Sequence, residues 1–190
     1  LALPLIALQY HEVKVNLTFG AVTAVNSASL WCDYIYLDTD ERRRFAQVSH
    51  EYLIEQLQFT GDETLSAGLN NVRLNFNHPV KELVWVAYAD GKSLVGGDPY
   101  IAPGSDNMKL QLNGHDRFAA RPAAYFNHVQ PYQHHTNIGT NVQVYSFALR
   151  PEEHQPSGTC NFSRIDNATL SVSAAAAATT LKVFAVNYNV

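Results

Sequence analysis

Hydrophobic and polar residues alternate with a period of two along most of the chain. The alternating segments are 13–19, 72–76, 110–112, 145–149 and 169–173. This is the period of a β-strand with one buried face. Two further segments, 83–88 and 181–186, are apolar at nearly every position, which favours central strands of a packed sandwich. The pattern predicts an all-β chain. We expect five side chains on these strands to be buried: Phe76, Trp85, Leu112, Phe147 and Val183.

Turn-forming residues separate the predicted strands. Asn113-Gly114 follows a short alternating segment and predicts a hairpin. Pro79 predicts a bend, because a proline in a central strand would remove a ladder hydrogen bond. The stretch 118–141 is rich in Pro, His, Asn and Tyr and has no period, so we predict an elaborate loop. The alanine run at 174–178 lies between two strand patterns and predicts a turn or a strand edge.

Only one segment has a helical pattern. Asp38 is a candidate N-cap, and Glu41, three residues later, would complete a capping box. Phe45 and Val48 then share one face, and we predict a short helix at 39–47. We place a linker at 38–49, because too few strands precede it to form a domain. The predicted domains are 1–37 and 50–190.

Composition narrows the function classes. Hydrophobic residues make up 46% of the chain, whereas charged residues make up 16%, below the roughly 25% of an average soluble domain. Much of the surface is therefore expected to be buried or to face a partner. The net charge of −4 gives no bulk attraction to nucleic acid. The basic run at 42–44 is expected to be a solvated helix face. No apolar run reaches the ~18 residues of a membrane span.

Further features concern the context of the chain. The two cysteines, Cys32 and Cys160, are too few and too far apart for a disulfide scaffold, and we expect free buried thiols. No basic region precedes the first apolar run, so no signal peptide is predicted. Without one, we do not expect glycosylation at the sequons of Asn16, Asn161 and Asn167. Both ends lie inside apolar runs, which predicts a fragment of a longer protein.

Two chemical alternatives deserve weighing. One is a cupin-like metalloenzyme, since five histidines lie near Glu152 and Glu153 in the second half: His115, His128, His134, His135 and His154. However, adjacent histidines on an extended chain point to opposite faces, so we predict no metal site. The other alternative is a carbohydrate-binding module using Trp31 and Trp85, although the apolar strand around Trp85 favours core packing. Nucleophile-elbow, phosphate-loop and dinucleotide motifs are absent from the sequence, and no catalytic residue or cofactor is predicted.

The segment 75–85, Asn-Phe-Asn-His-Pro-Val-Lys-Glu-Leu-Val-Trp, is distinctive. It closely resembles the Phe-x-His-Pro-Val-Lys-Glu-Leu-x-Trp segment of major capsid proteins of nucleocytoplasmic large DNA viruses. Further segments resemble the same family in the same order: 1–13, 38–58, 110–118 and 145–167. Within the family, the likeness is strongest to the iridovirus branch.

The resemblance implies a double jelly roll, a pair of β-sandwiches in one chain. Residues 1–37 would then be the last strands of the first jelly roll and 38–49 the linker with its short helix. Residues 50–190 would be the second jelly roll, lacking its extreme carboxyl-terminal tail.

The resemblance also implies a structural role without catalysis or cofactor. Homotrimers would form pseudo-hexagonal capsomers of an icosahedral virion, assembled in the host cytoplasm. The expected partners are further copies of the chain, neighbouring capsomers and minor capsid proteins, with no nucleic-acid contact and no membrane insertion. The loops at 96–107 and 118–141 are the candidates for tower and neighbour contacts.

Overall fold

The computed structural model describes residues 3–19, 27–89, 100–137, 139, 141–175 and 179–190. The chain forms two units, Leu1–Glu51 and Tyr52–Val190.

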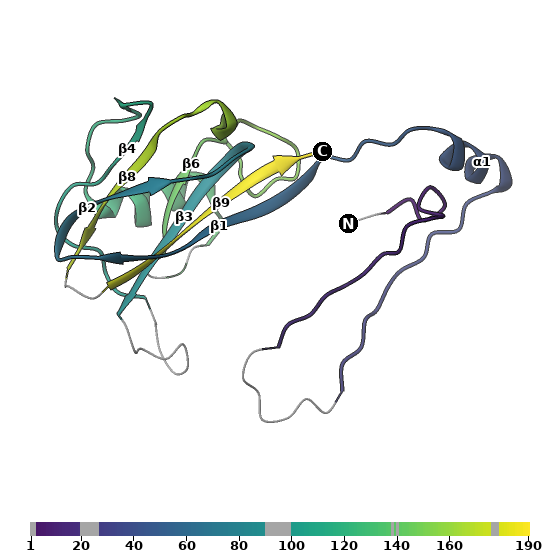
Figure 1. Cartoon of the computed structure of the whole chain (residues 1–190), viewed down its shortest axis with the longest axis horizontal. Helices are drawn as coiled ribbons and strands as arrows, with labels where there is room; N and C mark the ends of the chain where they lie inside the picture. Colours follow the sequence, from purple (N-terminus) through teal and green to yellow (C-terminus); the bar gives the residue numbers. More distant parts are fainter. Residues whose placement is uncertain (1–2, 20–26, 90–99, 138, 140, 176–178) are drawn as a thin grey trace. The chain divides into compact units, whose positions relative to one another are not determined.

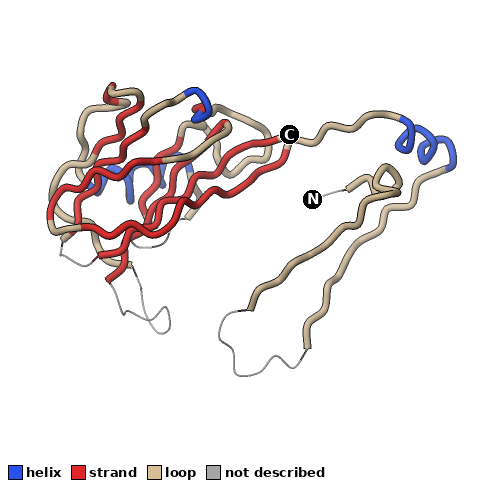
Figure 2. Tube along the Cα trace, in the orientation of Figure 1, coloured by secondary structure: helices blue, strands red, loops and turns tan. Residues whose placement is uncertain are grey.

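The second unit is a sandwich of two antiparallel sheets (Figures 1 and 2). One sheet has the order β1 (Ile54–Leu65), β9 (Thr179–Asn189), β3 (Pro79–Ala89), β6 (Gln143–Ser146), and β7 (Cys160–Asn161) also pairs with β3. The other has the order β2 (Gly68–Leu74), β8 (Ala168–Ala174), β4 (Lys109–Leu112), β5 (His115–Asp116). The chain passes between the sheets at β1–β2, β2–β3, β3–β4, β5–β6, β7–β8 and β8–β9. This strand order is that of a jelly roll, and the predicted fold class is confirmed.

The two segments that are apolar on both faces form the central strands β3 and β9. They pair with each other, with Leu83 opposite Ala185 and Trp85 opposite Val183. Each also pairs with an outer strand of the sheet, β6 on one side and β1 on the other. A strand with neighbours on both edges and side chains buried on both faces has no solvent-facing side, which explains its continuous apolar sequence.

Three of the five predicted core residues are buried, namely Phe76, Trp85 and Val183. Leu112 and Phe147 are only partly buried and pack against the core from its margin. The alternation predicted to reach residue 149 ends early, because β6 ends at Ser146 and the chain then bends. Leu149 is consequently 74% exposed.

Two of the predicted turns lie where the sequence places them. Asn113 and Gly114 connect β4 to β5 with φ values of 50° and 81°, and two consecutive positive values are typical of a type I′ hairpin. Pro79 is the first residue of β3, where its missing N–H costs no internal ladder bond. Ala174 ends β8, and residues 176–178 of the alanine run lie outside the described residues.

The predicted helix is α1, Thr39–Gln47. Its cap differs from the predicted box: the Asp38 carboxylate accepts a hydrogen bond of 2.7 Å from the first helical amide, that of Thr39. No bond from the Glu41 side chain to the Asp38 amide is recorded among the described residues. The three arginines at 42–44 are exposed, as expected.

The prediction of an elaborate loop at 118–141 is wrong in part, because this stretch contains a π-helix, η1 (Tyr125–Val129), and a short helix, α2 (Gln130–His134). A further 3₁₀ turn, η2 (Phe162–Arg164), follows β7. Phe126 is completely buried against Trp85, with ring centroids 5.3 Å apart. A wide π-turn followed by a proline at the start of a helix carries no regular 3.6-residue pattern. Tertiary packing therefore defines this segment.

No described helix is long and apolar enough to cross a membrane.

The first unit contains no β-strand within residues 3–19 and 27–51 of the structure, so the predicted strand at 13–19 is absent. Its alternating side chains are exposed, for instance Val13 at 51% and Leu17 at 68%. The reason is that a strand requires a hydrogen-bonded neighbour, and the described part of this unit supplies none. Both cysteines are free, as predicted, but Cys32 is exposed and Cys160 is only partly buried.

We expect Trp85→Ala to lower the free energy of unfolding by about 3–5 kcal/mol. The substitution removes the packing on Phe126 and the indole donor that bonds the Gln143 amide oxygen at 2.6 Å. Urea denaturation measures the effect. Leu149→Ala is the control, because this exposed side chain should change stability by less than about 0.5 kcal/mol. Equal midpoints for both variants would contradict the strand assignment.

We also expect residues 49–190 to fold without the residues before them. Light scattering after size-exclusion chromatography would compare 49–190 with 1–190. The longer chain should self-associate, because each large apolar side chain left in water forgoes roughly 1.5–3 kcal/mol. A soluble monomer at 1–190 together with an unfolded 49–190 would show that the first residues belong to the core of the second unit.

Candidate functional site

The structure disperses most residues of the two chemical alternatives, although it brings His135 and Glu152 together. Among the described residues, no group of three or more His, Cys, Asp or Glu is placed to hold a metal ion. His115 lies in the exposed strand β5, and His134 contacts the Leu149 carbonyl at 3.0 Å. Trp85 is completely buried and offers no sugar-binding face, whereas Trp31, in the first unit, is 91% exposed.

The sequence analysis missed a network of buried charges that starts at a bulge in β3. The register with β9 shifts between Val80 and Glu82, so that Lys81 is the extra residue. Val80 and Leu83 are both in the core, and the two charged residues lie between them. A bulge bends a strand and re-aims its side chains. The Lys81 carbonyl meanwhile accepts hydrogen bonds from the Phe147 and Ala148 amides, at 2.8 and 3.1 Å.

Lys81 joins three parts of the second unit. Its ammonium lies 2.9 Å from a carboxylate oxygen of Glu55 in β1 and donates to the Pro151 carbonyl at 2.7 Å. It also lies 5.6 Å from the ring centroid of Tyr188 in β9. The Lys81 side chain is only 5% exposed. Burial of a lysine is costly unless it is paired and hydrogen-bonded, and both conditions are met here.

Glu82, the next residue, faces His135 at the end of α2. The His135 Nε2 lies 2.9 Å from Glu82 Oε2, and its Nδ1 lies 3.3 Å from Glu152 Oε1. The contact between His135 Nε2 and Glu82 Oε2 is not aligned as a hydrogen bond and is an ion pair. Glu152 also accepts hydrogen bonds from the amide and the hydroxyl of Thr136.

The pKa values of this network are shifted in opposite directions. The contact with Glu82 raises the pKa of His135, and this outweighs burial, which acts in the opposite sense. The hydrogen bonds from Thr136, with the hydroxyl first, lower the pKa of Glu152. Both shifts favour the charged forms, and a carboxylate oxygen lies near each ring nitrogen of His135.

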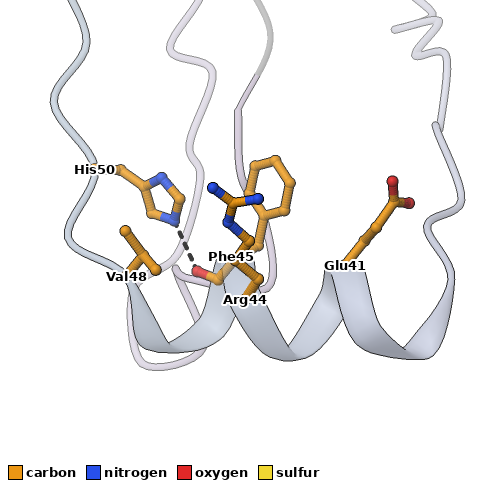
Figure 3. A pocket seen from close by; sticks show the side chains of 5 residues that line it. All are labelled: Glu41, Arg44, Phe45, Val48 and His50. Carbon is orange, nitrogen blue, oxygen red and sulfur yellow. Dashed lines mark hydrogen bonds between the residues drawn. The ribbon is translucent and has the colours of Figure 1, made fainter.

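The first unit has a hollow of about 370 Å³ beside α1, lined by Glu41, Arg44, Phe45, Val48 and His50 (Figure 3). The His50 ring stacks on Phe45, with centroids 5.3 Å apart, and its Nε2 contacts the Phe45 carbonyl at 2.7 Å. His50 therefore satisfies a carbonyl at the end of the helix, which is a structural role. The lining brings no nucleophile together with a base.

Two surface segments were predicted to make neighbour contacts. The helical segment exposes Val129 at 41% and Tyr132 at 90%. Of the loop at 96–107, residues 96–99 lie outside the described residues, and residues 103–106 contact β8. There, a Cβ at Gly104 would lie 2.9 Å from the backbone carbonyl carbon of Ala174 and closer still to the Ser173 side chain. The described part of this loop is thus attached to β8 at Gly104, whereas residues 105–107 are exposed.

The jelly-roll order and the 75–85 segment point to one family. The family model for the large eukaryotic DNA virus major capsid protein matches residues 41–190. The chain belongs to this family. A major capsid protein of Pyramimonas orientalis virus is 56% identical over 222 residues, covering 100% of this chain and 54% of that protein. The chain spans about half the length of the curated relatives it matches.

A solved capsid supports the same membership. The structure titled "PBCV-1 virus capsid, quasi-atomic model" has a TM-score of 0.66 and 42% identity, covering 81% of this chain and 52% of that one. The major capsid protein of Costelytra zealandica iridescent virus is 23% identical over 231 residues, covering 94% of this chain and 50% of that protein. Family membership is thus confirmed, but the iridovirus relative is less similar than the capsid proteins of Pyramimonas orientalis virus and PBCV-1. The comparisons support neither the cupin-like nor the carbohydrate-binding alternative.

We expect Lys81→Ala to destabilise this capsid protein by about 1–3 kcal/mol, because it leaves the Glu55 carboxylate and the Pro151 carbonyl without their donor. Lys182→Ala is the matched control on the same sheet. Lys182 is 34% exposed and pairs with Asp62, which is 48% exposed, so its loss should cost less than about 1 kcal/mol. If both variants lost the same free energy of unfolding in urea denaturation, the buried pair of Lys81 would contribute no more than an exposed ion pair.

Proposed function

We propose that this chain is part of a double-jelly-roll major capsid protein. Residues 50–190 are its second jelly roll, 38–49 the linker, and 1–37 the last strands of the first jelly roll. The observation that carries this proposal is the jelly-roll order of the second unit in a chain whose family model matches 41–190. The exposed apolar side chains of 13–19 support it further, because in a completed first jelly roll they would be covered.

The proposed role is structural, as a subunit of a virus capsid. Trimers form pseudo-hexagonal capsomers, and capsomers tile an icosahedral capsid together with minor capsid proteins. Support comes from the solved relative, which is titled as a virus capsid, and from the low content of charged residues, 16%. The protein then works through surface complementarity, so no catalytic residue, metal or other cofactor is needed. A stoichiometric metal in the purified chain would contradict this part of the proposal.

The proposed location is the virion, with assembly in the host cytoplasm. The net charge of −4 supports a shell protein that contacts other proteins and does not bind nucleic acid.

One surface is proposed to contact a second copy of the chain. Val129 and Tyr132 are spaced by three residues on the helical segment, and the neighbouring Leu149 is 74% exposed. The Leu149 carbonyl contacts His134 at 3.0 Å, which places residue 149 beside α2. Exposed apolar and aromatic side chains on an ordered segment are typical of the core of a protein interface.

We expect electron micrographs of the full-length protein to show pseudo-hexagonal trimers. Tyr132→Glu should dissociate them, because truncation of a central aromatic contact typically costs about 2 kcal/mol or more and a buried charge adds to this. Tyr132→Phe is the control and should keep the trimer. Full-length protein without trimers would contradict the assembly proposal, whereas intact Tyr132→Glu trimers would reject only this contact surface.

A further inference from the structure

His135 has a carboxylate oxygen at each of its two ring nitrogens. Nε2 lies 2.9 Å from Glu82 Oε2, and Nδ1 lies 3.3 Å from Glu152 Oε1. The three groups come from three segments: the end of α2, the bulge of β3, and the loop that follows β6. The His135 and Glu82 side chains are each only 11% exposed.

The protonation state of the ring decides whether both contacts are favourable. A neutral imidazole carries one N–H, so its other nitrogen would turn a lone pair toward a carboxylate oxygen. Only the imidazolium has an N–H on each nitrogen. Glu82 Oε2 is buried and has no hydrogen-bond partner among the described residues. An unpaired buried carboxylate is costly, so loss of the proton from His135 removes its compensation.

We propose that His135 is a protonation-dependent latch. As imidazolium it joins residues 130–136 to β3 and to the loop at 149–157. When the ring loses its proton, both segments lose this attachment and open more often, while the bonds through Lys81 and Gln130 remain and the sandwich stays folded. The proposal does not rest on the assembly function, because it concerns contacts within one chain.

The other charged groups around the latch are already paired or distant. Lys81, beside Glu82, is neutralised by Glu55 at 2.9 Å. In the loop, Arg150 pairs with Glu153 at 3.2 Å, and His154, 70% exposed, lies 3.9 Å from Glu55. Two further groups face the cluster: Tyr188 in β9 contributes a buried hydroxyl, and His134 on α2 contacts a backbone carbonyl. The two carboxylates at its nitrogens therefore dominate the field at His135.

The two ends of the pH window follow from the two shifts. The pKa of His135 is raised above its ordinary value of 6.5. The stabilisation that the protonated ring provides is therefore complete below pH 6.5 and is lost as pH rises through the folded-state pKa. The pKa of Glu152 is lowered from 4.5. The stabilisation that its carboxylate provides is therefore present above pH 4.5 and is lost as pH falls through the folded-state pKa. The latch is closed between these limits and opens on the alkaline side.

Two measurements on the chain 1–190 test the latch. Histidine NMR titration should give His135 a midpoint above the ordinary value of 6.5. Hydrogen exchange of 130–136 and 149–157, corrected for intrinsic rates, should lose protection as pH rises. The loss should be about tenfold for each pH unit by which the His135 midpoint exceeds that of an unfolded histidine. Peptides from β3 and β9 should keep their protection.

Matched variants separate the latch from general effects of pH. His135→Gln should show low protection from hydrogen exchange in both segments at every pH, with no alkaline transition. His154→Gln, in the loop at 149–157, should behave as the parent chain. Glu152→Gln changes a side chain that is 45% exposed and keeps the fold, and it should lower the His135 midpoint. A His135 midpoint at or below the ordinary value of 6.5, or an alkaline transition that persists in His135→Gln, would overturn the proposal.

Discussion

The second unit depends above all on the antiparallel pairing of β3 with β9. β3 ends at Ala89 and β9 begins at Thr179, so this pairing closes a long stretch of chain and carries a large entropic cost. Burial on both faces offsets the cost, with Trp85 opposite Val183 at its centre. Every other strand of that sheet attaches to one of these two: β1 to β9, and β6 and β7 to β3.

The bulge at Lys81 follows from the same pairing. In a strand with period-two alternation, two consecutive charged residues would place one charge in the core. The register shift avoids this and lets both side chains reach the segments that cover the sheet. The desolvation cost is met by Glu55 for Lys81 and by His135 for Glu82. Such pairs add little net stability compared with apolar residues, but breaking one is expensive, so they select one arrangement of the covering segments.

The sequence predicted the features that arise from local patterns. Alternation, turn chemistry and a capping residue are properties of a few consecutive positions, which is why β2, β8, β9, the Asn113-Gly114 hairpin and α1 were found. The helical segment was missed because it is defined by Phe126 docking on Trp85, residues 41 positions apart in sequence. The ionic network was missed for the same reason. Its only local signal was the Lys81-Glu82 pair within an apolar strand, a pair that the sequence analysis used only for family resemblance.

The molecule thus combines two kinds of interaction with different sensitivities. The sandwich is held by apolar side chains, whose burial does not depend on protons. The segments at 130–136 and 149–157 are fixed partly by Lys81, Glu82 and His135, and the strength of the last contact depends on one proton. These contacts are made by side chains, whereas β3 and β9 pair through their backbones, so the two segments can loosen while the β3–β9 ladder stays intact. A chain built in this way can keep a stable sandwich while the segments at 130–136 and 149–157 respond to pH.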